Sequence, residues 1–333
     1  MMGPLSYIIP AYNCCGTISE TVASIYTGNI ADDDEIVIVD DGSTDGTAHT
    51  LKELAAHYEA IRVVTQPCNR GGAVARNTAV ENARHDLMFC LDSDNVLISN
   101  SVGDLRTFQE RENADGAAFR EVRYFRDQCQ DTTHIWRYRD GVVTLADYLA
   151  GSVVPGASGN YLFTRASWKR AGGYPEFAGA LDTWGFGLRQ VATGQKMMVM
   201  PTGAYQHRYG HDSYWVREAR KGRISLTALR ILVPFIDQIS DSDIKYILRS
   251  SGRTDQLTWY WNLDRRPIRM INGRKGHAGI ALDLNGKMMP VGNGGVRALL
   301  LAPLRRLVRR LGGRAVYNRL LGGWKWIRLK RAR

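Results

Sequence analysis

Two aspartates directly follow a short apolar run in the segment Leu87-Met-Phe-Cys-Leu-Asp-Ser-Asp94. The run has the length of a buried strand, and alternate residues of an extended chain share a face, so Asp92 and Asp94 can point the same way. Two neighbouring carboxylates repel each other unless a cation lies between them, and their hard oxygens suit Mg²⁺ or Mn²⁺. Because Mg²⁺ is usually held by one or two carboxylates plus substrate phosphates, the pair predicts a phosphorylated substrate. The same residues are also common in turns.

Three strand-helix units precede this pair. Such alternation is typical of a parallel sheet with right-handed crossovers, whose ligands bind beyond the carboxyl ends of the strands. Each predicted strand is followed there by a polar or glycine-rich segment. The strands are 5–9 (ended by Pro10), 35–39 and 61–65, the helices are about 17–27, 47–58 and 73–83, and the segments are Pro10-Ala-Tyr-Asn13, Asp40-Asp-Gly-Ser-Thr-Asp-Gly46 and Asn69-Arg-Gly-Gly-Ala-Val-Ala-Arg-Asn77.

These segments, together with Leu-Asp-Ser-Asp, resemble in order and spacing the motifs of glycosyltransferase family 2, a large inverting group with the GT-A fold. The resemblance is strong over residues 5–100 and recognisable to about 212. It implies an α/β domain at 1–212, with a Rossmann-like, mostly parallel sheet flanked by helices. The nucleotide-sugar half would be about 1–100 and the acceptor half about 101–212. It also implies metal-dependent, inverting transfer of a sugar from a nucleoside diphosphate, expected to be UDP, to a hydroxyl of a glycan or lipid-linked glycan.

The donor nucleotide is expected at the ends of the first two strands. Pro10 and Tyr12 lie at the mouth of the predicted sheet, where the Tyr12 ring could stack on the base or could simply cover the core. The resemblance places the contact to the base on Asp41, since a carboxylate can accept the imide N–H of uracil. Alternatively, residues 40–45 only form the turn, with Ser43 or Thr44 capping the next helix, and both interpretations can hold together.

The donor phosphates are expected at the start of the third helix. Arginine binds phosphate in a bidentate manner, and a glycine-rich helix start offers backbone N–H groups to anions. Arg76 matches the family motif and is preferred to Arg70, although Arg76 could also be a surface charge of the helix. Gly71 and Gly72 would allow the backbone to approach closely.

The predicted cation site combines Asp94, Asp92 and a histidine. Asp94 is expected to bind Mg²⁺ or Mn²⁺ at the donor diphosphate, and Asp92 to bind the ribose or the same ion through water. Many GT-A enzymes have a histidine near this point of the chain as a further metal ligand or diphosphate contact. His207 follows a predicted strand at 197–200 and is preferred to His211, although a single histidine is more often structural.

The acceptor side is expected in residues 101–212. The segment 171–189 resembles the family's Gly-Gly-Phe/Tyr-Asp-Glu and Glu-Asp motifs, but Leu181 replaces the first acid of the second motif. The resemblance assigns the general base to the remaining acid, Asp182, which would take the proton of the acceptor hydroxyl as its oxygen attacks the anomeric carbon. Asp182 could also cap the helix that follows. Trp184 is equally compatible with an acceptor-stacking platform and with the core.

The C-terminal part differs in composition. Residues 284–333 contain 13 Lys or Arg and no Asp or Glu, so the rest of the chain carries only −2 of the net +11. We expect a mostly helical, basic extension, with a partly helical segment at 213–296 and an amphipathic tail at 297–333. Leucines and Val308 at helical spacing, four arginines opposite them, and Trp324 and Trp326 favour binding to an anionic membrane surface. Basic tails also bind nucleic acid nonspecifically, which is the less favoured interpretation, and a solvated tail is the third.

Further features of the sequence limit the possible location and function of the protein. No apolar run approaches a membrane span, no signal peptide is recognisable, and the five cysteines lack metal-ligand spacing. These features predict a cytoplasmic protein, peripheral on the inner face of the membrane. A dinucleotide fold would place Gly-x-Gly-x-x-Gly after the first strand, where it is missing. The alternative function is a catalytically inactive sugar-nucleotide-binding or scaffold protein of the same fold.

Overall fold

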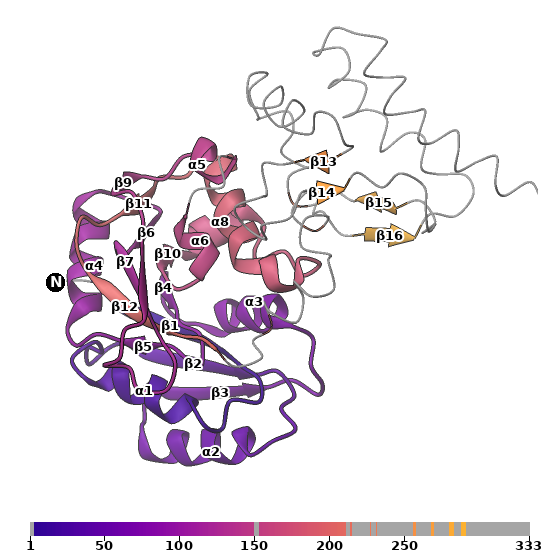
Figure 1. Ribbon diagram of the computed structural model, residues 1–333. Coiled ribbons are helices and arrows are strands. Elements are labelled where there is room, and N and C mark those ends of the chain that lie inside the picture. Colours follow the sequence, from indigo (N-terminus) through magenta and orange to yellow (C-terminus); the bar gives the residue numbers. More distant parts are fainter. Residues whose placement is uncertain are drawn as a thin grey trace, which may run out of the picture. The chain divides into compact units, whose positions relative to one another are not determined.

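The computed structural model describes residues 3–149 and 153–210, together with Tyr214, Thr227, Ile231 and four short strands further on (Figure 1). The chain divides into two compact units. The first comprises residues 1–148 and 153–221, and the second comprises 149–152 and 222–333.

The nucleotide half has the expected strand-helix alternation. β1 pairs in parallel with both β2 and β4, and β2 pairs in parallel with β3. Helix α3 covers one face of these strands, and α1 and α2 lie on the other (Figure 1). The elements are β1 (Leu5–Ala11), α1 (Ile18–Tyr26), β2 (Glu35–Asp40), α2 (Thr47–His57), β3 (Ile61–Thr65), α3 (Gly72–Asn82) and β4 (Leu87–Cys90).

The prediction that Pro10 ends the first strand is wrong, because β1 continues to Ala11. The carbonyl of Ile8 accepts from Leu91, and the carbonyl of Ala11 accepts from Asp41, so alternate residues bond to β4 and to β2. Pro10, two residues after Ile8, therefore faces β4. The pairing of β1 with β4 ends before it, since its last pair is Ile8 with Cys90. Its missing N–H is not needed there, and the usual objection to proline in a central strand does not apply.

The acceptor half extends this sheet and adds a second one. The large sheet has the strand order β3-β2-β1-β4-β10-β6-β11-β9, in which β10 is antiparallel to both of its neighbours, and the smaller sheet has the order β5-β12-β7-β8. The further elements are β5 (Val96–Leu97), α4 (Ser101–Arg111), β6 (Gly116–Ala118), β7 (Glu121–Phe125), β8 (His134–Arg137), β9 (Gly141–Val142), α5 (Leu145–Leu149), α6 (Pro155–Ser158), β10 (Leu162–Thr164), α7 (Arg165–Ala171), the 3₁₀ turn Gly179–Leu181, α8 (Asp182–Ala192), β11 (Met197–Val199) and β12 (Ala204–Arg208).

An aromatic cluster joins β10, an interior strand of the large sheet, to α8. The rings of Phe163 and Phe186 meet edge to face at 5.0 Å, and Tyr174 lies 4.2 Å from Phe186. All three are at most 1% exposed, and such pairs contribute about 0.5–1.5 kcal/mol beyond their buried area. The cluster fixes the start of α8, and hence Asp182, against β10.

The second unit contributes four described strands in two antiparallel pairs. β13 (Gln256–Leu257) pairs with β14 (Ile268–Arg269), and β15 (Ile280–Leu282) pairs with β16 (Met288–Pro290). Thr227 and Ile231 are helical, and both lie in the segment 213–296 that is expected to be partly helical. The predicted amphipathic tail at 297–333 lies outside the described residues. Among the described residues, no helix is long and apolar enough to cross a membrane.

Candidate active site

The motif residues gather where the strands of the nucleotide half end. Ala11 pairs with Asp40, and Ile8 pairs with Cys90, so the segments that follow β1, β2 and β4 leave the sheet at one edge. Tyr12 is 41% exposed there and remains available for stacking on a base. Asp92 follows β4 at the same edge, as the parallel topology predicted.

The loop after β2 is held by hydrogen bonds within itself and to the loop after β1. The prediction that Ser43 or Thr44 caps α2 is wrong. Both bond instead to Asn13, and Asp45 accepts the Thr47 N–H at 2.9 Å. Burial works against ionisation of Asp45, but hydrogen bonds from Thr47 and Cys15 outweigh it and lower the pKa of this carboxyl to about 2. Asn13 has a φ of 49°, a left-handed conformation that asparagine tolerates, and it brings the first two loops together.

Asp41 organises the loop that leads into α3. Its two carboxylate oxygens accept the N–H groups of Arg70 and Gly71, each at 2.8 Å, and the residue is 2% exposed. Gly42 has a φ of 68°, and a Cβ there would lie 2.5 Å from the backbone of Cys68, so the two loops can meet only at a glycine. The N–H groups of Arg70 and Gly71 belong to the glycine-rich segment expected to bind phosphate, and Asp41 therefore occupies both.

Arg76 joins the two halves of the domain. Its Nη2 donates to Asp92 Oδ1 at 2.5 Å, and its Nη1 donates to Asp182 Oδ2 at 2.6 Å. Arg76 is 8% exposed and Asp182 is 5% exposed, which rules out the interpretation of Arg76 as a surface charge of its helix. An arginine from α3 thus bridges the aspartate pair after β4 and the candidate base at the start of α8.

The charges of this cluster influence one another. Burial raises the pKa of Asp182, and the nearby Arg76 guanidinium offsets part of that rise. Burial alone would favour loss of the Arg76 proton, but Asp182 and Asp92 hold the pKa of Arg76 well above its usual value. Asp182 is the first residue of α8, and its Oδ1 accepts the Thr183 N–H at 2.8 Å. The carboxylate lies close to the positive end of that helix, where a negative charge is stabilised.

Two asparagines that sequence analysis missed support the aspartate pair. Asn160 accepts the Asp92 N–H at 2.7 Å through Oδ1 and donates to Asp92 Oδ2 at 3.0 Å through Nδ2. Asn95 is fully buried, its Nδ2 lies 3.3 Å from His207 Nδ1, and its Oδ1 accepts the Arg208 N–H at 3.0 Å. The sequence offered one signal for them. An amide side chain beside a buried strand needs hydrogen-bond partners for its polar atoms.

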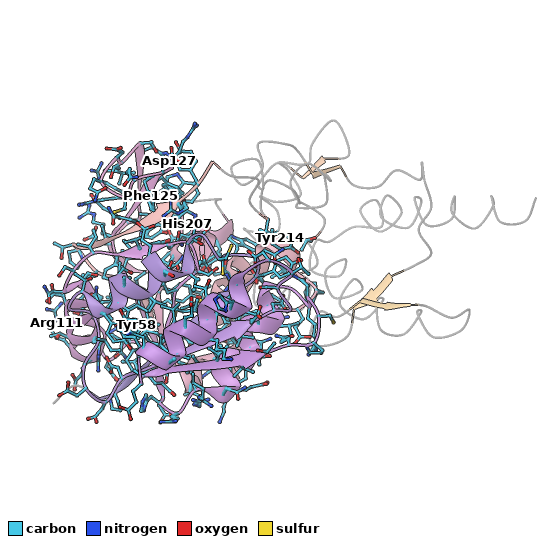
Figure 2. The ribbon with its side chains drawn as sticks, turned by 90° about the horizontal axis from the view of Figure 1, so that it is seen from below. Tyr58, Arg111, Phe125, Asp127, His207 and Tyr214 are labelled. Carbon is cyan, nitrogen blue, oxygen red and sulfur yellow. The ribbon has the colours of Figure 1, made fainter. Side chains whose placement is uncertain are left out.

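Arg208 was also missed, although it follows His207 directly. Its Nε donates to the Asp94 carbonyl at 3.3 Å, its Nη1 donates to the Asp127 carbonyl at 3.2 Å, and its guanidinium lies 4.5 Å from the centre of the Phe125 ring. Figure 2 shows His207, Phe125 and Asp127 in the same region of the domain. Arg208 therefore ties the aspartate loop to the end of β7.

The three predicted metal ligands do not form a ready-made site. No group of three or more His, Cys, Asp or Glu side chains able to hold a metal is present in the described part of the chain. Asp92 is engaged by Arg76 and Asn160, and the His207 ring packs 4.8 Å from Tyr124. The side chains suit the other mode of Mg²⁺ binding, in which one or two carboxylates act together with substrate phosphates. His211 lies outside the described residues.

The acceptor segment is anchored to α3 by Asn77. This side chain accepts the Tyr174 N–H at 2.8 Å and donates to the Tyr174 carbonyl at 3.0 Å. It also accepts the Trp168 indole N–H at 3.0 Å. Trp184, by contrast, is 2% exposed and meets Tyr148 edge to face at 5.8 Å, which favours its interpretation as core.

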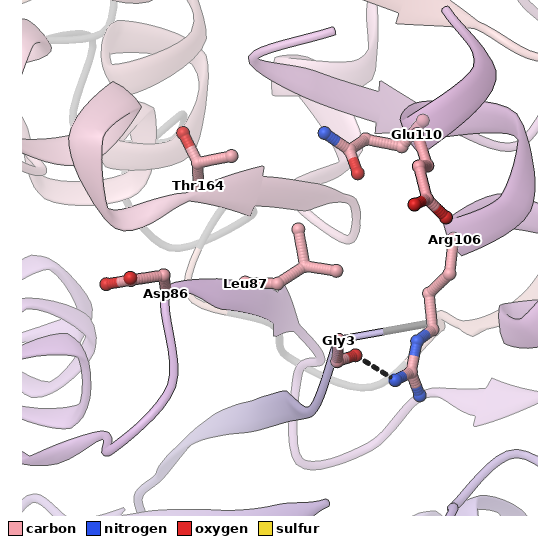
Figure 3. Close-up of a pocket in the computed structure, with 7 residues that line it drawn as sticks. Gly3, Asp86, Leu87, Arg106, Glu110 and Thr164 are labelled. Carbon is pink, nitrogen blue, oxygen red and sulfur yellow. Dashed lines mark hydrogen bonds between the residues drawn. The ribbon is translucent and has the colours of Figure 1, made fainter. Parts of the chain in front are cut away.

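A surface pocket lies at the other end of the sheet. Gly3 and Leu87, at the amino ends of β1 and β4, line it with Arg106 (Figure 3). Arg106 donates to the Gly3 carbonyl and, at 2.8 Å, to Asp34, so its charge is already compensated. This pocket is separated by the length of the strands from the residues that bear the motifs, and we assign it no part in the candidate site.

Proteins of similar sequence point to one family. The family model described as glycosyl transferase family 2 matches residues 6–170. Poly-beta-1,6-N-acetyl-D-glucosamine synthase of Staphylococcus epidermidis is 31% identical over 93 residues, which are 28% of this chain and 22% of that protein. The putative teichuronic acid biosynthesis glycosyltransferase TuaG of Bacillus subtilis is 42% identical over 90 residues, or 27% of this chain and 35% of TuaG. The chain thus spans about a third or less of the length of these relatives.

Solved structures resemble the domain in fold. The S. aureus TarS fragment 1-349 in complex with UDP-GlcNAc has a TM-score of 0.57 at 16% identity, covering 88% of this chain and 97% of that one. The mannosyltransferase PcManGT from Pyrobaculum calidifontis, in complex with GDP-Man and Mn²⁺, has a TM-score of 0.51 at 20% identity, covering 78% and 71%. The mostly parallel sheet flanked by helices is thus the expected GT-A fold. With its motifs assembled at one edge of that sheet, the chain carries a glycosyltransferase family 2 domain over residues 6–170.

Proposed function

We propose that this chain is an inverting glycosyltransferase, which transfers a sugar from a nucleoside diphosphate to a hydroxyl of a glycan or lipid-linked glycan. The observation that supports this most directly is the bridge from Asp92 through Arg76 to Asp182, with bonds of 2.5 and 2.6 Å. It places a cation suited to phosphate beside a buried carboxylate suited to proton removal.

Asp182 is the proposed general base. The acceptor oxygen forms a bond to the anomeric carbon while the bond from that carbon to the diphosphate oxygen breaks, and the diphosphate leaves with the electron pair. Asp182 takes the hydroxyl proton during this single displacement, which inverts the anomeric centre. Burial raises the pKa of Asp182 and so makes it a stronger base than an exposed aspartate.

The donor is proposed to lie along the carboxyl edge of β1, β2 and β4. Pro10 and Tyr12 would contact the base, Asp92 the ribose, and Arg76 the diphosphate. Asp41, whose oxygens already order the loop before α3, would use a remaining lone pair for the base. The titles of the similar structures mention UDP and UDP-GlcNAc for TarS and GDP-Man for PcManGT, and we propose UDP as the nucleotide here.

A Mn²⁺ or Mg²⁺ ion is proposed to be held by Asp94, with Asp92 and His207 as further contacts once the donor is bound. Its chemistry would be to neutralise the negative charge of the leaving diphosphate. The PcManGT complex, which contains Mn²⁺ together with GDP-Man, supports this proposal.

The acceptor and the location of the protein are proposed on different grounds. The names of relatives, including poly-beta-1,6-N-acetyl-D-glucosamine synthase and chondroitin synthase, favour a polysaccharide or its lipid-linked precursor as acceptor. Because Trp184 is buried, it could stack on an acceptor sugar only if α8 rearranged to expose it.

The basic tail at 297–333 is proposed to hold the protein peripherally on the cytoplasmic face of an anionic membrane.

A donor screen tests the proposed function. UDP-GlcNAc, other UDP-sugars and GDP-Man are incubated with the full chain, with Mn²⁺, with Mg²⁺ or with a chelator, and release of the nucleoside diphosphate is measured. We expect slow, cation-dependent hydrolysis of one donor, and transfer when a suitable glycan is added. Binding of a nucleotide without any turnover would favour the inactive binding protein, and the absence of both would overturn the proposal.

A further inference from the structure

We propose that Asp182 and the donor diphosphate compete for Arg76, so that the base is released from its arginine only when the donor is bound. This inference rests on the proposed function and adds an order of events to it. The enzyme without donor would hold its base in an ion pair, and donor binding would have to come before proton removal.

The geometry supports competition because Arg76 is shared between two elements. One terminal nitrogen bonds to Asp92 and the other to Asp182. A diphosphate beside Asp92 would present oxygens to the same donors, and a planar guanidinium has only a few directions in which it can donate. Asp182 can give up its bond without losing all partners, because it keeps the Thr183 N–H, just as Asp92 keeps the Asn160 amide.

Arg76 also has unused hydrogen-bonding capacity. Its Nε is buried and has no hydrogen-bond partner in the described part of the chain. A buried donor without a partner is unfavourable and is relieved when a ligand supplies an acceptor. Gly72 lies against the same group, since a Cβ there would be 2.6 Å from Arg76 Nη1 and 3.1 Å from Asp182 Oδ2. The absent side chain leaves the guanidinium accessible from the start of α3.

Release of Asp182 would change its reactivity. Within the ion pair, the positive guanidinium stabilises the carboxylate and so weakens it as a base. After Arg76 turns to the diphosphate, Asp182 stays buried but loses that stabilisation, and its affinity for a proton increases. The base would therefore become strongest when a donor is in place, which suits transfer to an acceptor that binds second.

Competition makes an unusual prediction for binding. Substituting Asp182→Asn removes the competitor, so UDP should bind about fivefold or more tightly to the variant than to the wild-type chain, within the usual range of coupling between two sites. The matched control is Glu176→Gln, which removes an exposed negative charge from the same segment; Glu176 contacts Asn77 at 3.5 Å. We expect this control to change UDP affinity less than twofold.

Calorimetric titration of UDP, with GDP in parallel and with Mg²⁺ present, measures these affinities in the full chain. A double-mutant cycle adds Arg76→Gln, in which the gain from Asp182→Asn should disappear. If that variant does not fold, as judged by its thermal midpoint, the comparison of Asp182→Asn with Glu176→Gln decides alone. Unchanged or weaker binding to Asp182→Asn, or an equal gain in Glu176→Gln, would overturn the competition while leaving the proposed function intact. Failure of the wild-type chain to bind either nucleotide would overturn both.

Discussion

The substitution Gly72→Ala tests how closely the site is built around the Arg76 bridge. A Cβ at this position would lie 2.6 Å from Arg76 Nη1, so the guanidinium must retreat by roughly 1 Å to reach an ordinary contact distance. The 2.6 Å bond from Nη1 to Asp182 then becomes too long to be a hydrogen bond. Loss of a hydrogen bond between charged groups costs about 1.5–3 kcal/mol. Alanine regains about 0.5–1 kcal/mol through its helix propensity.

We therefore expect Gly72→Ala to lower the free energy of unfolding by about 0.5–2.5 kcal/mol, measured by urea denaturation. Turnover should fall about 10²-fold, because the displaced guanidinium no longer meets the donor diphosphate in its productive position, and displacements near 1 Å have effects of this size. Gly103→Ala in α4 is the matched control, since a Cβ there meets nothing within 4 Å. It should stabilise the protein by up to about 1 kcal/mol and leave turnover unchanged. Equal behaviour of the two variants would refute this account of the bridge.

Further predictions concern the base, the cation and the tail. Asp182→Asn should reduce turnover by about 10²-fold or more while UDP binding persists, and a parallel loss in both assays would assign Asp182 to donor binding or folding instead. Burial raises the pKa of Asp182 above the ordinary 3.8. As the pH is lowered, kcat/KM should therefore begin to fall while the pH is still above 3.8, because the base becomes protonated; a fall that begins only at or below pH 3.8 contradicts this. Asp94→Asn should nearly abolish cation-dependent turnover without shifting the thermal midpoint of the metal-free protein, and full activity in chelator would contradict the cation site. Deleting 297–333 should abolish salt-sensitive sedimentation with anionic vesicles but retain donor hydrolysis, and equal sedimentation of both proteins would exclude the tail as anchor.

Much of the nucleotide half could be predicted from sequence because its signals are local. β-branched runs and helix periodicity gave β3 its observed bounds and placed α1 and α3 within one residue. The error at Pro10 arose because the cost of proline depends on which neighbour its N–H would face. That information lies in the register of three strands and not in the residues around Pro10.

The candidate site was less predictable because its contacts join distant parts of the chain. Sequence analysis singled out Arg76, Asp92 and Asp182 separately, but their bridge depends on contacts 16 and 106 residues apart. Asn160 was missed because its place beside a buried strand indicates only that the amide needs partners, and does not indicate that Asp92 is the partner. Trp184 could not be assigned from sequence, since an aromatic residue on a helix suits both a core and a sugar platform.

The arrangement of the large sheet limits how this protein can be recombined with its relatives. β4 is the last strand of the nucleotide half, and its free side is covered by β10, which lies more than 70 residues later in the chain. A fragment ending near residue 100 would expose β4 as an unpaired edge, a template for aggregation. The two halves are therefore not interchangeable cassettes. A chimera that imports another acceptor half must also import a strand whose side chains fit Leu87, Met88 and Phe89, the residues that β10 pairs with along β4.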